Sequence, residues 1–170
     1  MTGAVISLAT LGITPRMVAE CSLPPCQEPS ELIDAGNDLF GRPQRMTPET
    51  LSSWHAMQHA AGRDGIELQL VSAFRSINYQ CEVIQRKLQD GRTIEDILGS
   101  NAIPGYSEHH TGRALDLHSG KGPPLEEAFE QTPAFNWLVR NADRFCFYLS
   151  YPRDNQLGIS YEPWHWCYKT

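Results

Sequence analysis

The sequence contains no hydrophobic run long enough to cross a bilayer and no excess of positive charge. A membrane-spanning helix needs about 20 consecutive, mostly apolar residues, and the 170 residues contain no such run. The 14 lysines and arginines are outnumbered by 20 aspartates and glutamates, which gives a net charge of −6. Because phosphate-binding surfaces depend on clustered Lys and Arg, this balance argues against nucleic acid as a partner. We expect neither a membrane span nor nucleic-acid binding.

The sequence also has no regular framework of paired cysteines and no charged N-terminal leader. Its five cysteines are an odd number and widely scattered, so we expect free thiols rather than disulfides. Cys21 and Cys26 could pair or hold a metal, but no second pair accompanies them. The mildly apolar stretch 4–13 is preceded by no Lys or Arg, the first being Arg16. We therefore expect a cytoplasmic protein, with the periplasm, reached by an unrecognised export route, as the alternative.

The length and the pattern of prolines predict one domain with an N-terminal arm. A chain of 170 residues is long enough for one core. Prolines and glycines punctuate residues 1–45, so we expect this part to be an arm packed on the domain, with a short helix near 31–38. Residues 46–170 form the expected domain.

Hydrophobic periodicity and capping residues predict the elements of that domain. Helices are expected at 48–61 and 77–88, in a short segment after Thr93, and after Thr132. Strands are expected at 66–72, 113–117, 145–151 and 164–168. Helices come first and strands cluster late, without regular alternation. This order favours an α+β fold with a mostly antiparallel sheet and flanking helices.

The C-terminal part of the chain carries the residues that suit a metal site. Four of the six histidines follow residue 108. Asp116 lies between two leucines on an expected strand, where a buried carboxylate needs a partner such as a divalent cation. A histidine on the loop entering that strand and His165 could reach the same ion, with Glu162 beside the ion but not bound to it. Two His and one Asp with an open position are typical of catalytic zinc.

Two other patterns admit a functional and a structural interpretation. His55 and His59 are spaced i,i+4 on one expected helix, but no third ligand accompanies them, so we expect solvent-exposed side chains. Arg75 follows an expected strand and precedes a helix, a position suited to binding an anion or a developing oxyanion. An ordinary surface arginine is the alternative.

Three motifs together resemble those of the VanY-like zinc D-alanyl-D-alanine carboxypeptidases. They are Ser72-Ala73-Phe74-Arg75-Ser76 with Gln80, Ser107-x-His109-x-x-Gly112-x-Ala114-x-Asp116, and Glu162-Pro163-Trp164-His165. The resemblance covers roughly residues 47–169, in the same order and with similar separations. It implies a Hedgehog/DD-peptidase fold, a small α+β domain with an antiparallel sheet and flanking helices.

The resemblance also implies a role for each matching residue. His109, Asp116 and His165 are the implied zinc ligands, and Glu162 is the implied general base. Arg75 is expected to stabilise the oxyanion, while Ser107 and Gln80 are expected to line the pocket for the C-terminal residue. His110 and His118 do not align with ligands. Phe74, Cys146 and Cys167 depart from residues common in relatives, which concerns substrate contacts rather than the metal site.

The implied activity is hydrolysis that removes the C-terminal D-alanine of peptidoglycan stem peptides. The substrate is a tetrapeptide for an LD-carboxypeptidase and a pentapeptide for a DD-carboxypeptidase, and the sequence leaves both open, as it does the oligomeric state. If the protein is cytoplasmic, recycled tetrapeptides or soluble precursors are the accessible substrates. The alternative is a zinc-retaining, non-catalytic peptide or protein binding module of the same fold. Such a module has no need of a base, so Glu162 favours the enzyme.

Overall fold

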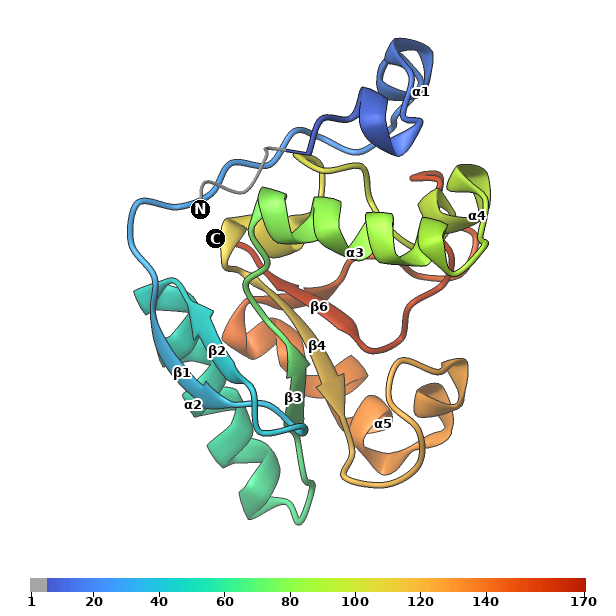
Figure 1. Cartoon of the computed structure of the whole chain (residues 1–170). Coiled ribbons are helices and arrows are strands. Elements are labelled where there is room, and N and C mark those ends of the chain that lie inside the picture. Colours follow the sequence, from blue (N-terminus) through green and yellow to red (C-terminus); the bar gives the residue numbers. More distant parts are fainter. Residues whose placement is uncertain (1–5) are drawn as a thin grey trace.

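The computed structural model describes residues 6–170 as a mixed α+β structure (Figure 1). Five α-helices are present in the described part: α1 (Pro15–Ala19), α2 (Pro48–Arg63), α3 (Ile77–Gln89), α4 (Ile94–Leu98) and α5 (Pro133–Asn141). The strands are β1 (Ile33–Asn37), β2 (Pro43–Met46), β3 (Gln69–Ser72), β4 (Ala114–His118), β5 (Phe147–Leu149) and β6 (His165–Tyr168). Four short 3-10 helices are η1 (Ala9–Leu11), η2 (Glu108–Thr111), η3 (Glu127–Gln131) and η4 (Ala142–Phe145). The predicted α+β class is confirmed.

The central sheet has four strands in the order β3-β4-β6-β5, and every neighbouring pair is antiparallel. A separate antiparallel pair joins β1 to β2. The predicted strands all occur, but each is shorter than expected or shifted by one residue. Strand ends are poorly marked by periodicity alone, because a polar residue can either alternate within a strand or begin a turn.

One face of the central sheet is covered by a hydrophobic core and the other faces the functional cavity. Leu115 and Leu117 of β4 and Trp166 of β6 pack with side chains of α2 and α5, including Trp54 and Leu138. Helix α3 crosses the molecule on the other side of the sheet (Figure 1). Since side chains alternate along a strand, residues 116 and 165 point away from this core.

The helix starts that the sequence predicts are set by local capping. The hydroxyls of Thr47, Ser76, Thr93 and Thr132 each accept a hydrogen bond from a backbone amide in the first turn of the following helix. Each bond satisfies an amide that has no partner within its helix, which stabilises such a start by about 1 kcal/mol.

The prediction of a short helix near residues 31–38 is wrong, because this segment forms strand β1. Ile33 pairs with Met46 of β2. Gly36 has a φ of 79°, outside the right-handed helical region, and its amide donates to the Asp34 carboxylate at 2.7 Å. The Asp34 side chain stabilises a turn in this segment, and the segment pairs with a strand more than ten residues away. These interactions take the place of the expected helix.

The N-terminal segment contributes to a second, smaller hydrophobic cluster. Leu11 and Ile13 are buried against Ile84 of α3 and Ile97 of α4. The five cysteines, from Cys21 to Cys167, are unpaired. Within residues 6–170, no helix combines the length and apolarity that a bilayer crossing requires.

Candidate metal centre

Antiparallel register brings Asp116 and His165 together. Asp116 of β4 is the direct partner of His165 of β6, and residues opposite each other in an antiparallel pair point to the same face. Their neighbours Leu115 and Trp166 form the next pair and point into the core instead. The Asp116 carboxylate therefore contacts the His165 ring, with Oδ1 lying 3.0 Å from Nδ1.

The third residue of the cluster, His109, comes from the 3-10 helix that precedes β4. Ser107 caps η2 by accepting a hydrogen bond from the His109 amide at 3.3 Å. Gly112 ends η2 with a φ of 67°, and a Cβ there would lie 2.8 Å from a Leu32 methyl carbon. A glycine is needed for both reasons. The turn directs His109 toward β4, with its Nε2 lying 3.2 Å from Asp116 Oδ2.

His109, Asp116 and His165 are all buried, and one ligand atom from each lies within 4.8 Å of the others. Ligands bound to zinc at 2.0–2.2 Å lie roughly 3.3 Å apart around a tetrahedral ion. The observed contacts of 3.0 and 3.2 Å are close to that separation. The structure thus brings together the three ligands predicted from the motifs.

Hydrogen bonds on the far side of each ring leave the inner nitrogen free for a metal. His109 Nδ1–H donates to the Ala73 carbonyl at 2.6 Å, and His165 Nε2–H donates to the Glu108 carboxylate at 3.0 Å. When both rings are neutral, the nitrogens that face the Asp116 carboxylate carry lone pairs, so one hydrogen-bond acceptor faces another. A cation resolves that conflict, and outer-shell acceptors of this kind are typical partners of metal-ligating histidines. The residues therefore fit zinc.

The charge distribution also favours a cation. Burial would raise the pKa of Asp116, but the two histidines outweigh it and hold that pKa well below its usual range. Burial disfavours the charged form of His165, yet hydrogen bonds to Asp116 and Glu108 raise its pKa to about 10. Protons or a metal ion can supply the positive charge that this cluster requires, and both compete for the same nitrogens.

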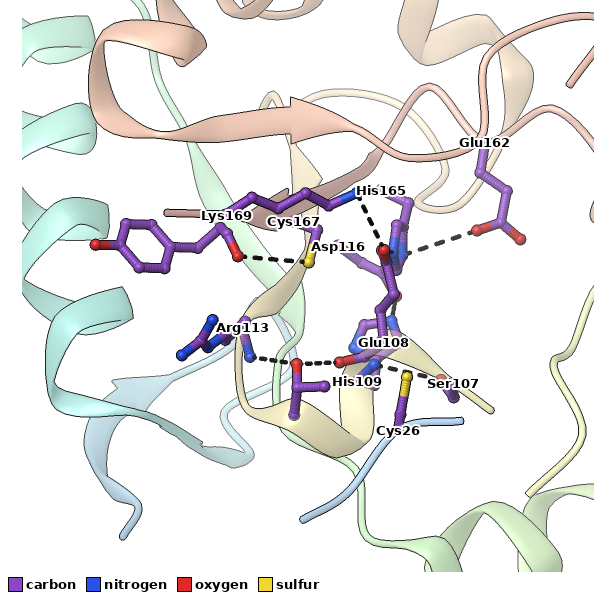
Figure 2. Close-up of polar contacts among 12 residues, drawn as sticks. Cys26, Ser107, Glu108, His109, Arg113, Asp116, Glu162, His165, Cys167 and Lys169 are labelled. Atoms are coloured by element: carbon purple, nitrogen blue, oxygen red, sulfur yellow. Dashed lines mark hydrogen bonds and ion pairs between the residues drawn. The ribbon is translucent and has the colours of Figure 1, made fainter. Parts of the chain in front are cut away.

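Glu162 lies next to the cluster without joining it. Its Oε2 is 3.9 Å from His165 Nδ1, and Figure 2 shows the carboxylate reaching toward that ring. Backbone hydrogen bonds hold the turn, because the Glu162 amide donates to the Tyr151 carbonyl and its carbonyl accepts from the His165 amide. Within residues 6–170, the carboxylate accepts no hydrogen bond from a side chain or an amide. Burial and the nearby Asp116 raise its pKa to about 7, although His165 opposes this.

A cavity of about 270 Å³ opens over the cluster, and Arg75, Gln80 and Ser107 line it together with Glu162. Arg75 donates through Nη1 to Gln80 Oε1 at 2.9 Å and through Nη2 to Ser72 Oγ at 3.4 Å. Gln80 is almost fully buried, and its Nε2 donates to the Ala102 carbonyl. The amide of Gln80 therefore holds the guanidinium in place at the cavity wall, in addition to lining the pocket.

The remaining histidines do not join the metal cluster. His110 Nδ1–H donates to the Arg75 carbonyl at 2.6 Å, and its Nε2 accepts from the Gly105 amide at 3.1 Å. His118 bonds in the same two-sided way to Gly122 and Gly120. His55 and His59 are exposed on α2. The first two stabilise loops, and the last two match the expected solvent-exposed pair.

Three further residues belong to the site, although the sequence motifs assigned none of them a role. Glu108 lies inside the second motif and bonds His165 from the far side. Tyr151 is buried with its ring 4.7 Å from that of His165. Lys87 lines the cavity seven positions after Gln80, and this spacing along one helical face was the available signal.

Comparisons with known proteins identify the family and the fold. The family model described as "VanY: D-alanyl-D-alanine carboxypeptidase" matches residues 43–170. The solved LdcB LD-carboxypeptidase superposes with a TM-score of 0.74 at 32% identity, covering 85% of this chain and 71% of that one. A vancomycin-resistance D,D-pentapeptidase VanY, solved in complex with Zn(II), has a TM-score of 0.65 at 26% identity and covers 86% and 82%.

Among curated proteins, YodJ of Bacillus subtilis (strain 168) is 33% identical over 156 residues. The alignment covers 86% of this chain but only 56% of YodJ, so the chain spans little more than half of that relative. The fold is that of the solved VanY and LdcB peptidases. The chain belongs to the VanY family of D-alanyl-D-alanine carboxypeptidases, and the resemblance seen in its motifs is confirmed.

Proposed function

We propose that the protein is a zinc metallocarboxypeptidase that removes the C-terminal D-alanine from peptidoglycan stem peptides, whether tetrapeptides or pentapeptides. The observation that carries the proposal is the buried cluster of His109, Asp116 and His165, with one ligand atom of each within 4.8 Å. It lies at a cavity that Glu162 and Arg75 also line. The relatives' names support the substrate class, because they include LD- and D-alanyl-D-alanine carboxypeptidases.

His109, Asp116 and His165 would hold the zinc. When bound, zinc acts as a Lewis acid that polarises the peptide carbonyl and makes water more acidic. Glu162 would take a proton from the attacking water and return it to the amine of the departing D-alanine. A carboxyl group with a pKa near the working pH can both accept and donate the proton. Burial raises the pKa of Glu162 to about 7, toward that range.

Arg75 would stabilise the negative charge that develops on the carbonyl oxygen. Its guanidinium is fixed before substrate arrives, because Gln80 and Ser72 accept hydrogen bonds from it. A donor held in place does not have to reorganise during the reaction, which is the basis of oxyanion stabilisation. Gln80 and Ser107 would contact the C-terminal residue from the cavity wall.

The scattered cysteines favour a cytoplasmic location, where soluble tetrapeptides or precursors would be the accessible substrates. A zinc-retaining binding module would need the ligands and the cavity but not a buried carboxylate beside the metal. The Glu162 carboxylate, which accepts no hydrogen bond within residues 6–170 and lies 3.9 Å from His165 Nδ1, therefore favours hydrolysis over binding alone.

The test is to incubate zinc-loaded protein with purified tetrapeptide and pentapeptide muropeptides and to identify products by mass spectrometry. We expect loss of one alanine residue from at least one of them, abolished by a chelator and restored by added zinc. His165→Ala should lose both zinc and activity, because it removes one of three ligands. A parent that binds these peptides but releases no D-alanine would instead be a binding module.

A further inference from the structure

The cavity has a second positive group, Lys87, beyond the residues that the reaction uses. Lys87 lies on α3 seven positions after Gln80, and both line the cavity. Seven residues are two helical turns, so the two side chains share one face about 10 Å apart along the axis. Lys87 therefore extends the cavity wall away from Arg75 and the metal ligands.

The Lys87 ammonium group is held at the cavity by an uncharged partner. It donates to the side-chain oxygen of Asn101, which also lines the cavity. Within residues 6–170, no carboxylate lies within ion-pair distance of it. Burial lowers the pKa of Lys87, and the positive charges of Arg92 and Arg75 lower it further, while Glu162 opposes them. The cation is thus partly desolvated; the described chain gives it no ion-pair partner, and the charge of Glu162 offsets only part of the effect of burial.

The other permanent cation on the cavity wall is already engaged. Arg75 bonds to Gln80 and Ser72 and stands where the carbonyl oxygen would develop charge. A stem peptide brings carboxylates into this cavity, and each needs a positive partner once it leaves water. Lys87 is the group that can supply it, with Asn101 orienting the ammonium.

We infer that Lys87 binds a carboxylate of the substrate peptide and so determines which peptides are accepted. This rests on the proposed function. The carboxylate has two chemical sources: the free C-terminus of the departing D-alanine, or the side chain of a diamino diacid, diaminopimelate, at the third position of the peptide. A peptide with lysine at that position has no such side-chain carboxylate.

Binding can be measured apart from hydrolysis in the zinc-loaded Glu162→Gln protein. Four tetrapeptides are titrated by calorimetry: lysine or diaminopimelate at position three, each ending in D-alanine or D-alanine amide. Adding Lys87→Met should weaken binding of the carboxylate-bearing peptides by about 10–100-fold, the range for a lost charged hydrogen bond. Lys87→Arg should restore most of the affinity. Lys121→Met, at an exposed lysine outside the cavity, should change nothing.

The pattern of loss identifies the carboxylate. If Lys87→Met removes the preference for acid over amide, Lys87 binds the C-terminus; if it removes the preference for diaminopimelate over lysine, Lys87 binds the side chain. Equal affinity of parent and Lys87→Met for all four peptides overturns the inference, as does failure of every peptide to bind. D-alanine release by the protein with Glu162 intact tests the proposed function separately, because carboxylate-dependent binding without release would refute hydrolysis alone.

Discussion

Two glutamates contact the same histidine, and their surroundings put them in opposite states. Glu108 bonds to His165 Nε2 at 3.0 Å, whereas Glu162 approaches Nδ1 at 3.9 Å. Figure 2 shows them reaching the ring from different directions. Burial acts on both, and the difference comes from what each carboxylate can bond to.

Glu108 is held as a carboxylate on the Nε2 side. Burial would raise its pKa, but the hydrogen bond and charge of His165, together with Lys169 at 3.4 Å, lower it to about 2. Glu162 accepts no hydrogen bond within residues 6–170, and the charge of His165 offsets burial only in part, so its pKa rises to about 7. Paired groups with pKa values pushed apart are typical of divided roles. In the proposed function, Glu108 orients His165 through its hydrogen bond, and Glu162 transfers the proton.

The largest expected effect comes from Glu162→Gln. Glutamine keeps the size and polarity of the side chain but cannot accept a proton, so D-alanine release should fall by about 100–10,000-fold. Zinc content should stay near one equivalent, because Glu162 is not among the three ligands. A coupled D-amino-acid oxidase assay and elemental analysis on one preparation measure both. Release at the parent's rate would show that Glu162 is not the base.

Arg75→Ala tests whether the positive charge near Glu162 acts on the transition state. Removing one oxyanion donor typically lowers turnover by about 100–1000-fold. We expect kcat to fall by a larger factor than KM rises, and Arg75→Lys to recover part of it. If only KM changes, Arg75 binds a substrate carboxylate instead, and its assigned role is wrong.

Glu108→Gln should affect the metal more than the chemistry. The amide oxygen can still accept from His165 Nε2–H, but the negative charge that increases ligand basicity is lost. Zinc affinity should fall by about 10–100-fold, measured by competition with a chromogenic chelator, while turnover at saturating zinc stays within a few-fold. Glu82→Gln, an exposed position on α3, is the control. Unchanged zinc affinity would remove the distinction between the two glutamates.

The smallest effect is expected for Lys169→Met. Its ammonium lies 3.4 Å from Glu108 Oε1, but the side chain is 51% exposed, and ion pairs at such positions contribute at most about 1 kcal/mol. Zinc affinity should therefore fall by no more than about fivefold, and the difference from the parent should shrink in high salt. A loss as large as that of Glu108→Gln would mean that Lys169 is needed to hold Glu108 in place.

The three residues of the candidate metal cluster could be predicted because each lies in a short motif with its own local reason. Asp116 is a carboxylate in an apolar strand, and Gly112 ends the turn that carries His109. Glu108 and Lys87 could not be assigned in this way. Glu108 meets His165 across 57 positions of sequence, and Lys87 reaches the cavity because α3 forms part of its wall. Such contacts depend on how elements pack, which periodicity does not report.

The sequence by itself determined the family, the α+β class, the helix starts and which three residues are expected to bind a metal. These depend on local features: capping hydroxyls, alternating apolar residues and motif spacing. Only the tertiary structure decided that residues 33–37 form a strand and that Asp116 pairs with His165. It also decided that two glutamates beside one ring differ in pKa, from about 2 to about 7. The reason is physical, because register, burial and charge at a site depend on neighbours that lie far away along the chain.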